Sequence, residues 1–352
     1  MDHALRRRRL LDRFDDLGIE ALLVTRLVNV RYLTGFTGSN AQLLLRPDDA
    51  VLFTDGRYDE QSRHEVPDLR RVIYLKKMTE AVAKETPRLR LGFEARGLLY
   101  DTFRLLEESL EAELVPLTDT VEQLRWVKDA DEIRLLEAAQ AVTDEAFEVV
   151  VGKLAEGVTE RDVALELEHA MRAAGAERVG FDAIVAFGPS AAEPHHHPTH
   201  RPLARGDVVK IDFGCVVDGY HSDMTRTVAF GDPGERMREI HEVVRRAQQA
   251  GIDAVRAGVE GAEPDRIARE VIRGAGFGEL VHSLGHGVGL EIHEGPTLRR
   301  GSEEVLPEGA AVTVEPGIYL PGEGGIRIED TVIVGGDGCR PLPTTTKELI
   351  VL

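Results

Sequence analysis

Residues 208–229 read VVKIDFGCVVDGYHSDMTRTVA, and the rest of the chain can be interpreted outward from this stretch. It predicts two strands joined by a tight turn at Asp218 and Gly219, because Asp-Gly between β-rich runs is a strong signal for a two-residue hairpin. A turn of this length places Val217 opposite Tyr220. The stretch therefore specifies a hairpin together with its register.

The same register brings two carboxylates to one face of the hairpin. Gly214 falls opposite Asp223, and Asp212 lies two positions from that pair on the same face. Diagonal neighbours of this kind are roughly 7–8 Å apart between backbones, so the two side chains can converge on one point. Since Asp is disfavoured inside strands, two interpretations remain, a solvated sheet face or a pair of oxygen ligands for metal ions.

The composition is that of a soluble protein with room for two domains. The chain has 352 residues, 42% of them hydrophobic and 30% charged, which suits sizeable cores. A net charge of −19 argues against binding nucleic acid or an anionic membrane. No apolar run approaches a membrane span, and the arginines at 6–9 are not followed by a signal-peptide core. The two cysteines, Cys215 and Cys339, suggest no disulfide framework, so we expect a cytoplasmic protein.

The first 125 residues alternate short apolar strands with helices, which is typical of an α/β domain. We expect strands at Ala21–Thr25, Ala41–Leu45, Ala50–Thr54, Arg71–Leu75 and Leu91–Phe93. We expect helices at 3–17, 57–64 and 99–112, the first of them an amphipathic surface helix with solvated arginines. The texture changes near residue 125, so the predicted domains are 1–125 and 126–352.

The second domain begins with helices and ends with strands. Helical spacing predicts helices over Asp131–Val151, from the N-cap Thr159 to a stop at Gly175, and over Glu235–Ala257 and Asp265–Arg273. Strands follow in AAVTVE (310–315) and GIRIEDTVIV (325–334). Strands grouped apart from helices indicate an α+β domain.

Three further residues carry chemistry of the kind that metal ions require. Glu315 ends an apolar strand and precedes Pro-Gly, which would terminate pairing there. Strand alternation puts Arg327 on the same face as Glu329, where it can orient that carboxylate. His286 lies in a glycine-rich run that has neither GxGxxG spacing nor the Lys-Ser/Thr of a phosphate loop. Taken singly, each has an ordinary interpretation, as a surface residue or a hydrogen-bonded loop residue.

Together these stretches resemble the pita-bread metallopeptidases, and within them the Xaa-Pro peptidases (prolidase and aminopeptidase P). The matching stretches are KIDFG (210–214), HSDMTRT (221–227), GHGVGLEIHEGP (285–296), TVEPGIY (313–319) and IRIED (326–330). In the first domain, NVRYLTGFTGSNA (29–41) and LFTDGRYDEQ (52–61) are similar to the creatinase-type N-terminal domain. The resemblance implies a creatinase/ribonuclease H-like α/β domain followed by an α+β pita-bread catalytic domain.

The resemblance also implies a site for two metal ions. Asp212 would hold one ion, His286 and Glu315 the other, and Asp223 and Glu329 would bridge both. Four carboxylates and one imidazole suit Mn²⁺ and are compatible with Co²⁺ or Zn²⁺. Two divalent ions would neutralise carboxylates that otherwise repel one another, and they would lower the pKa of a shared water to supply hydroxide.

Catalytic roles follow from the same resemblance. Glu315 is the candidate for shuttling a proton to the leaving nitrogen. His195, in AEPHHHPT, and His293, seven residues beyond His286, match histidines able to donate hydrogen bonds to the developing oxyanion. The substrate-binding and supporting positions are His282, Tyr220, Tyr319 and Arg327. Cys215 and His196 are not expected to take part.

The implied reaction is hydrolysis of the bond between an N-terminal residue and a following proline, in proline-containing peptides. The compact chain favours a dipeptidase (prolidase) slightly over an aminopeptidase P that acts on longer peptides. Some dipeptidases of the family carry an arginine just after the HE-x-P segment, whereas Thr297 stands here and the nearest cations are Arg299 and Arg300.

Other classes remain open. A methionine aminopeptidase usually lacks such a first domain, and creatinase works without metals. A non-catalytic binding protein on the same fold typically loses ligands, and this chain retains all five. The family further implies a homodimer.

Overall fold

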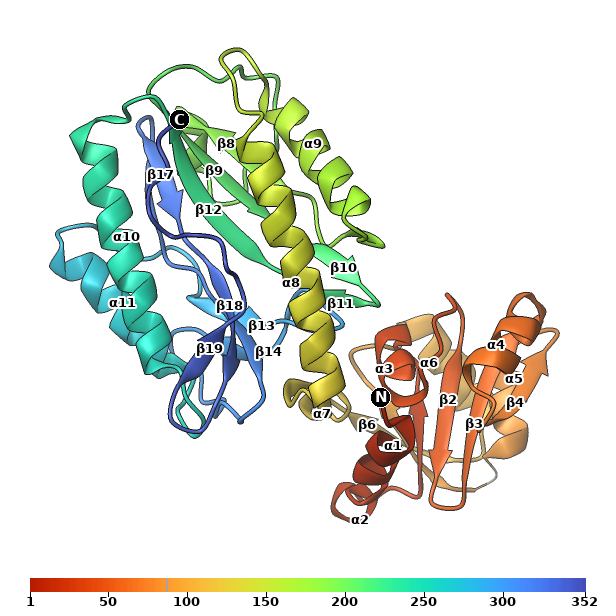
Figure 1. Cartoon of the computed structure of the whole chain (residues 1–352). Coiled ribbons are helices and arrows are strands. Elements are labelled where there is room, and N and C mark those ends of the chain that lie inside the picture. The colour runs from red at the N-terminus through yellow and green to blue at the C-terminus, as the bar shows by residue number, and fades with distance from the viewer. Residues whose placement is uncertain (87) are drawn as a thin grey trace. The chain divides into compact units, whose positions relative to one another are not determined.

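The computed structural model describes residues 1–86 and 88–352. The chain divides into two compact units, Met1–Arg125 and Trp126–Leu352 (Figure 1). Each unit has its own hydrophobic core. Over the described residues, no helix combines the length and the apolar character that crossing a bilayer requires.

The first unit is built on a mixed sheet of six strands in the order β4-β3-β2-β1-β5-β6. β2 runs antiparallel to both of its neighbours, β1 and β3. The parallel pairs are β3 with β4, β1 with β5 and β5 with β6. The elements are α1 (His3–Leu11), α2 (Phe14–Leu17), β1 (Ala21–Val24), α3 (Leu27–Thr34), β2 (Gln42–Arg46), β3 (Asp49–Asp55), a 3-10 turn at Gly56–Tyr58, α4 (Asp59–Glu65), β4 (Arg70–Tyr74), α5 (Met78–Glu85), β5 (Arg90–Glu94), α6 (Tyr100–Ser109), β6 (Glu113–Leu117) and α7 (Glu122–Trp126). The α/β prediction is confirmed.

The prediction of one surface helix over 3–17 with solvated arginines is wrong. The helix ends at Leu11, and Arg6 and Arg7 are buried. Their guanidinium groups donate to the carbonyl oxygens of Tyr32 (3.1 Å) and Leu33 (2.9 Å), at the C-terminal end of α3. The last carbonyls of a helix have no partner within the helix, and cations are favoured at that end. The two arginines are therefore drawn inward by a helix that the sequence did not reveal.

The second unit contains two pairs of long helices with strands between them in the sequence. The elements are α8 (Ala130–Val151), α9 (Glu160–Ala173), β7 (Arg178–Val179), β8 (Ile184–Phe187), a 3-10 turn at Gly188–Ala192, β9 (Asp207–Phe213), β10 (Cys215–Val217), β11 (Tyr220–His221), β12 (Met224–Phe230), α10 (Gly234–Ala254), α11 (Ala262–Gly274), β13 (Gly285–Gly287), β14 (Glu294–Leu298), β15 (Ala311–Val314), β16 (Gly317–Leu320), β17 (Gly324–Arg327), β18 (Asp330–Val334) and β19 (Cys339–Pro341). This grouping confirms the α+β prediction.

The hairpin from β9 to β12 has the predicted register. Val217 pairs with Tyr220 across the turn, and Asp212 pairs with Thr225 farther along the ladder. The turn residues have positive φ, which is the conformation of the tight turns that connect twisted strands. Gly214 lies against the facing strand, where a Cβ atom would come within 1.9 Å of the Ser222 carbonyl oxygen. A glycine is required there for the strands to approach and present their carboxylates.

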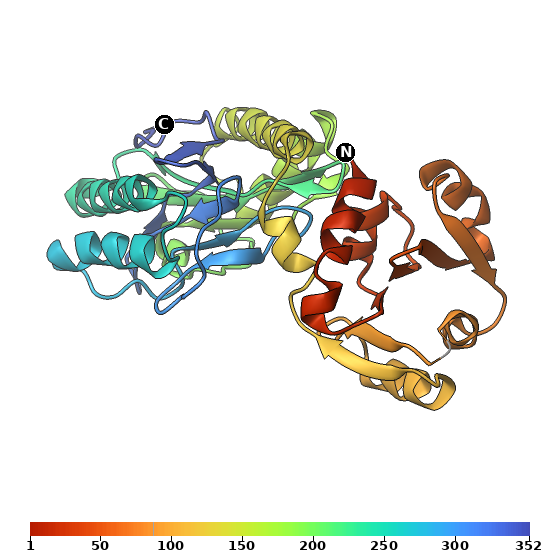
Figure 2. The same ribbon diagram turned by 90° about the horizontal axis from the view of Figure 1, so that it is seen from below.

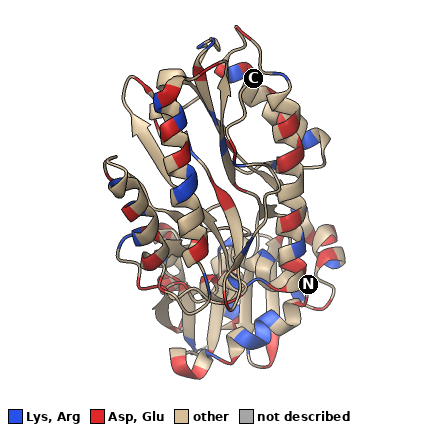
Figure 3. Ribbon diagram, turned by 60° about the vertical axis from the view of Figure 1, so that its left-hand side comes forward, with Lys and Arg blue, Asp and Glu red and all other residues tan. Residues whose placement is uncertain are grey.

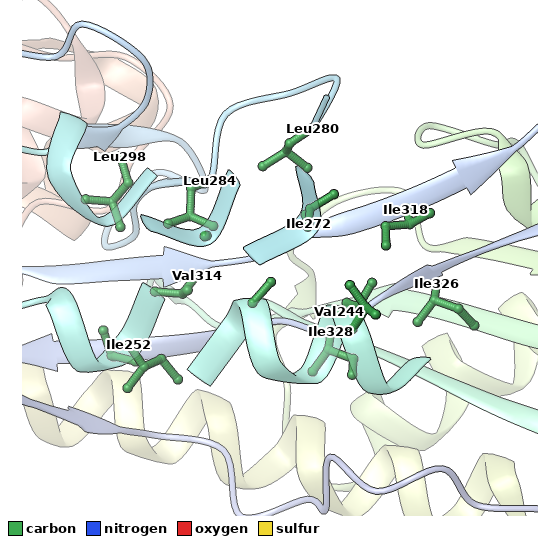
Figure 4. Close-up of a cluster of buried hydrophobic side chains, with 14 of the residues drawn as sticks. Val244, Ile252, Ile272, Leu280, Leu284, Leu298, Val314, Ile318, Ile326 and Ile328 are labelled. Atoms are coloured by element: carbon green, nitrogen blue, oxygen red, sulfur yellow. The ribbon is translucent and has the colours of Figure 1, made fainter. Parts of the chain in front are cut away.

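The helices pack against the strands through two apolar clusters. Thr159 caps α9 as predicted, because its side chain accepts a hydrogen bond from the amide of Asp162. α8 and α9 share one cluster with β9 and β12. α10 and α11 lie side by side (Figure 2) and share the other cluster with β15 and β17. Figure 4 shows side chains of the latter cluster, with Val244 near Ile326 and Ile328. Charged residues of both signs are interspersed along the helices (Figure 3). The two apolar clusters fix the strands that carry the site.

Candidate metal centre and active site

Most of the predicted site residues of the second unit line one cavity of about 360 Å³, which we call the acidic cavity. Its lining includes Asp212, Asp223, His286, Glu315, Glu329, His195, His282, His293 and Arg327. These residues come from segments that are far apart in the sequence. Tyr319 lies behind the cavity wall, and Tyr220 lies elsewhere, where its hydroxyl donates to Glu132 on α8 at 2.8 Å. Tyr220 therefore supports the scaffold and does not reach the cavity.

Two pairs of neighbouring strands, β9 with β12 and β15 with β18, carry the four carboxylates. Asp212 is inside β9, and Asp223 directly precedes β12, the strand that pairs with β9. Glu315 directly follows β15 and Glu329 directly precedes β18, and these two strands pair antiparallel with Val314 opposite Asp330. The two glutamates are therefore brought together by strand pairing, as the two aspartates are.

His286 lies among the carboxylates. Its Nε2 atom is 3.4 Å from Glu315 Oε1 and 3.6 Å from Asp223 Oδ2. Its Nδ1 atom is 3.1 Å from the carbonyl oxygen of Gly287, and since a carbonyl can only accept, Nδ1 carries the proton and Nε2 keeps its lone pair. One ligand atom from each of Asp223, His286 and Glu329 lies within 4.8 Å of the others. This is the arrangement expected of ligands that share one ion.

The carboxylates of the acidic cavity carry more negative charge than their surroundings stabilise. Burial raises the pKa of Glu315 to about 8. Burial and the neighbouring carboxylates raise the pKa of Asp223 and of Glu329 well above the ordinary range. Burial, with a smaller contribution from His293, lowers the pKa of His286 to about 4. Without cations the acids are driven toward their protonated forms, whereas the imidazole is already neutral.

The residues present fit a divalent metal centre. The Oδ1 atom of Asp212 is buried without a hydrogen-bond partner in the described part of the chain, and an unsatisfied buried oxygen of this kind is costly. The other Asp212 oxygen accepts from Arg327. Buried carboxylates beside a neutral imidazole form a donor set that suits Mn²⁺, Co²⁺ or Zn²⁺.

Arg327, predicted to orient Glu329, is linked to it through a threonine. Its guanidinium donates to Asp212 and, through Nε, to Thr225 Oγ1 at 3.1 Å. The Thr225 hydroxyl in turn donates to Glu329 Oε2 at 2.7 Å. Thr225 was not predicted as a site residue, although the hairpin register places it directly opposite Asp212. The threonine therefore links the arginine to the glutamate.

The three predicted histidines occupy different positions around the cavity. The ring of His293 packs edge-on against that of His286, with centroids 4.3 Å apart. The hydroxyl of Tyr319 donates to His282 Nε2 at 2.8 Å, because His282 Nδ1 donates to the Ser283 carbonyl oxygen, and the same hydroxyl accepts from Arg327 at 2.9 Å. His195 is exposed at the cavity rim. Burial lowers the pKa of His282 to about 4, so this ring is a neutral hydrogen-bonding group.

A buried lysine also adjoins the site and was missed. Lys210 lies two residues before Asp212 on β9, on the same face of the strand, and is fully buried. Burial, and then the charge of Arg327, lowers its pKa to about 7. The signal was present in the sequence, because a lysine inside the apolar run VVKIDF requires a buried partner.

Comparison with known proteins identifies the family. The fold and the acidic cavity are those of a metal-dependent enzyme. Metallopeptidase family M24 matches residues 134–335, and the Creatinase/Prolidase N-terminal domain matches residues 6–127. The chain belongs to metallopeptidase family M24. It is therefore a metal-dependent peptidase with a creatinase-type N-terminal domain, as predicted, and the family implies divalent metal ions.

Three relatives cover nearly the whole chain. An Xaa-Pro dipeptidase of Pyrococcus furiosus is 37% identical over 342 residues, 96% of this chain and 97% of that protein. The structure of an Xaa-Pro dipeptidase from Bacillus anthracis matches at TM-score 0.96 and 40% identity, over 100% of both chains. The structure of an X-Pro aminopeptidase from Thermotoga maritima matches at TM-score 0.91 and 36% identity, over 99% of this chain and 100% of that one.

Proposed function

We propose that this chain is an Xaa-Pro peptidase that hydrolyses the bond between an N-terminal residue and a following proline, with Xaa-Pro dipeptides as its preferred substrates. The observation that carries the proposal is the convergence of four carboxylates and one neutral imidazole on a single cavity. Full-length relatives that bear the name Xaa-Pro dipeptidase support it.

Five side chains would hold two divalent ions, most suitably Mn²⁺. Asp212 would hold one ion, and His286 with Glu315 would hold the other. Asp223 and Glu329 would serve both, and each has a ligand atom within 4.8 Å of one on His286. When bound, such ions polarise a carbonyl and make water a nucleophile at neutral pH.

The remaining steps fall to the side chains around the cavity. Glu315 moves the proton from the nucleophile to the leaving imide nitrogen, which suits a carboxyl group at the edge of the ligand set. His195 and His293 donate hydrogen bonds to the oxygen that becomes negative in the transition state. Tyr319, bonded to His282 and Arg327, holds the wall behind them.

Proline is a distinctive leaving group because its imide nitrogen has no hydrogen and its ring fixes the backbone. The acidic cavity has apolar side chains beside its polar ones, namely Phe181, Ile184 and Ile292. An apolar wall next to a proton donor suits a pyrrolidine ring that must be gripped and protonated. This supports specificity for proline at the position after the cleaved bond.

An aminopeptidase P is the second candidate. Neither Arg299 nor Arg300 is among the described residues that line the acidic cavity, so neither is placed to bind the carboxylate of a dipeptide. Chain length does not discriminate, because the Thermotoga X-Pro aminopeptidase is matched over its full length. The two candidates are therefore distinguished by whether the enzyme prefers a dipeptide or a longer peptide as its substrate.

Hydrolysis of an Xaa-Pro dipeptide beside an Xaa-Pro-Xaa tripeptide, after the enzyme is stripped of metal and reloaded with Mn²⁺, tests the proposal. We expect metal-dependent cleavage of both, with the dipeptide preferred. Preference for the tripeptide would establish the aminopeptidase. Cleavage of neither by metal-loaded protein would refute the function and favour a binding role on the same fold.

We further propose a cytoplasmic homodimer in which 1–125 is the creatinase-like domain and 126–352 the catalytic domain. Sedimentation velocity of the full chain tests the dimer, which a single species of monomer mass would contradict.

A further inference from the structure

Residues 191–199, which we call the His195 segment, form a wall with open space on both sides. His195 lines the acidic cavity, whereas His197 and Pro198 line a second cavity of about 500 Å³. Within the described residues, the side chain of His195 makes no hydrogen bond. The position of this ring therefore depends on how the main chain of the segment is held.

The buried amine of Lys210 holds the first half of the segment. Lys210, fully buried on β9, donates from Nζ to the carbonyl oxygens of Ala191 (3.1 Å), Glu193 (2.5 Å) and Pro194 (3.5 Å). Arg327 donates to the same Pro194 oxygen at 3.2 Å. The carbonyl oxygen of Pro194, directly before His195, thus accepts from the Lys210 amine on β9 and from the Arg327 guanidinium on β17.

A buried anion holds the second half. Glu160, fully buried at the start of α9, accepts through Oε2 from the amide and hydroxyl of Thr199 at 2.9 and 2.6 Å. The same oxygen is 2.9 Å from His196 Nε2. Its Oε1 accepts from the amide of Phe187 at 2.9 Å. Three of these four contacts are to the His195 segment and the fourth is to β8, so Glu160 ties the second half of the segment to that strand.

A buried charge is costly unless hydrogen bonds satisfy it. Most hydrogen bonds of the Lys210 and Glu160 side chains are made to this segment. Because cavities lie on both sides of the segment, few packed side chains are available to hold it in place instead. We propose that Lys210 and Glu160 are positioning residues that fix His195 over the substrate, a role that rests on the proposed function. A displacement of about 1 Å at a reacting centre can cost a factor of about 100 in rate.

Kinetics and hydrogen exchange on the Mn²⁺-loaded full chain test this inference. Lys210→Met, which keeps the volume and removes the charge, is expected to lower kcat by about ten- to a hundredfold with KM nearly unchanged and metal content unchanged. Amides of 191–199 should exchange roughly tenfold faster. If Lys210→Met does not fold, Glu160→Gln carries the same test, because its amide keeps an acceptor oxygen.

A double-mutant cycle separates positioning from general destabilisation. In a His195→Ala background, Lys210→Met should lower kcat no further, since its effect passes through the missing ring. The control is Lys347→Met, which removes a cation bonded to Asp330 and Gln248. It should lower stability without changing kcat or exchange in the segment.

Equal losses of kcat in both backgrounds, or unchanged exchange at 191–199, would overturn the inference. A parent enzyme that cleaves no Xaa-Pro substrate would overturn the proposed function alone. In that case the exchange rates of the variants decide by themselves whether the two charges hold the segment.

Discussion

Glu329 and Asp330 are consecutive carboxylates, both about 2% exposed, and they lie in opposite electrostatic environments. Glu329 faces the acidic cavity, where burial and the other carboxylates raise its pKa. Asp330 faces away and contacts Arg226 Nη2 at 2.7 Å and Lys347 Nζ at 3.0 Å. Burial opposes its ionisation, but these two cations outweigh burial and lower the pKa of Asp330.

The contrast separates two uses of buried charge at consecutive positions, since Glu329 directly precedes β18 and Asp330 begins it. A carboxylate with matched cations, such as Asp330, is part of the scaffold, and Gln248 adds a further hydrogen bond to it at 3.1 Å. A carboxylate that shares its surroundings with other carboxylates, such as Glu329, lacks sufficient countercharge and is available to metal ions. Replacing a buried carboxylate is therefore expected to have opposite consequences at these two positions.

The largest effect is expected from Glu329→Gln. Removing a carboxylate that we propose to be shared by both ions should lower Mn²⁺ content and reduce dipeptide hydrolysis by more than about a thousandfold. The metal-free variant should unfold at the same or a higher temperature than the metal-free parent, because a neutral amide can still accept from Thr225 and removes a penalised charge. A destabilised metal-free variant would break the comparison.

Asp330→Asn should do the reverse. It leaves Arg226 and Lys347 without their shared anion, and removing one partner of a buried ion pair typically costs about 3–5 kcal/mol. Urea unfolding of the metal-free protein at pH 7 measures the loss. A change smaller than about 1 kcal/mol would show that the Asp330 cluster is not the matched site described here.

The metal-free protein should lose stability as the pH rises. The folded pKa of Glu315, about 8, lies above its ordinary value of 4.5, so its contribution is complete below pH 4.5 and is lost as the pH approaches 8. Each unit of pKa difference corresponds to about 1.4 kcal/mol, which predicts a slope that Glu315→Gln reduces. Denaturant unfolding between pH 5 and 8 checks it, and an equal slope in both proteins would contradict the account.

The smallest effect is expected where charge is exposed. Arg245 on α10 pairs with Glu242 at 2.9 Å, with both side chains in contact with solvent. Exposed pairs contribute less than about 1 kcal/mol, so Arg245→Ala should leave unfolding and metal content almost unchanged. A loss as large as that for Asp330→Asn would show that burial is not what distinguishes the clusters.

Local patterns predicted the parts of this molecule that depend on neighbours in the sequence. The Asp-Gly turn and strand alternation located Asp212 and Asp223 on one face, and the register is confirmed. The single strand predicted over 325–334 is instead two strands, β17 and β18, and Glu329 lies between them. The helix α3 was missed because LVNVRYLT is short, rich in β-branched and aromatic residues, and has no side-chain cap at Arg26.

Long-range partners could not be predicted. Lys210 bonds to carbonyls 16–19 positions away in the sequence, and the partners of Asp330 come from other elements. Main-chain acceptors have no sequence signature, since every residue supplies one. The sequence therefore indicates which residues are available for the site, whereas the three-dimensional structure determines which charges are compensated.

The most direct test of the central claim is Mn²⁺ titration, by calorimetry, of metal-free parent, Glu329→Gln and Asp330→Asn proteins. We expect two ions per chain for the parent and for Asp330→Asn, and fewer for Glu329→Gln. A Glu329→Gln protein that binds two ions as tightly as the parent, or a folded parent that binds none, would contradict the central claim.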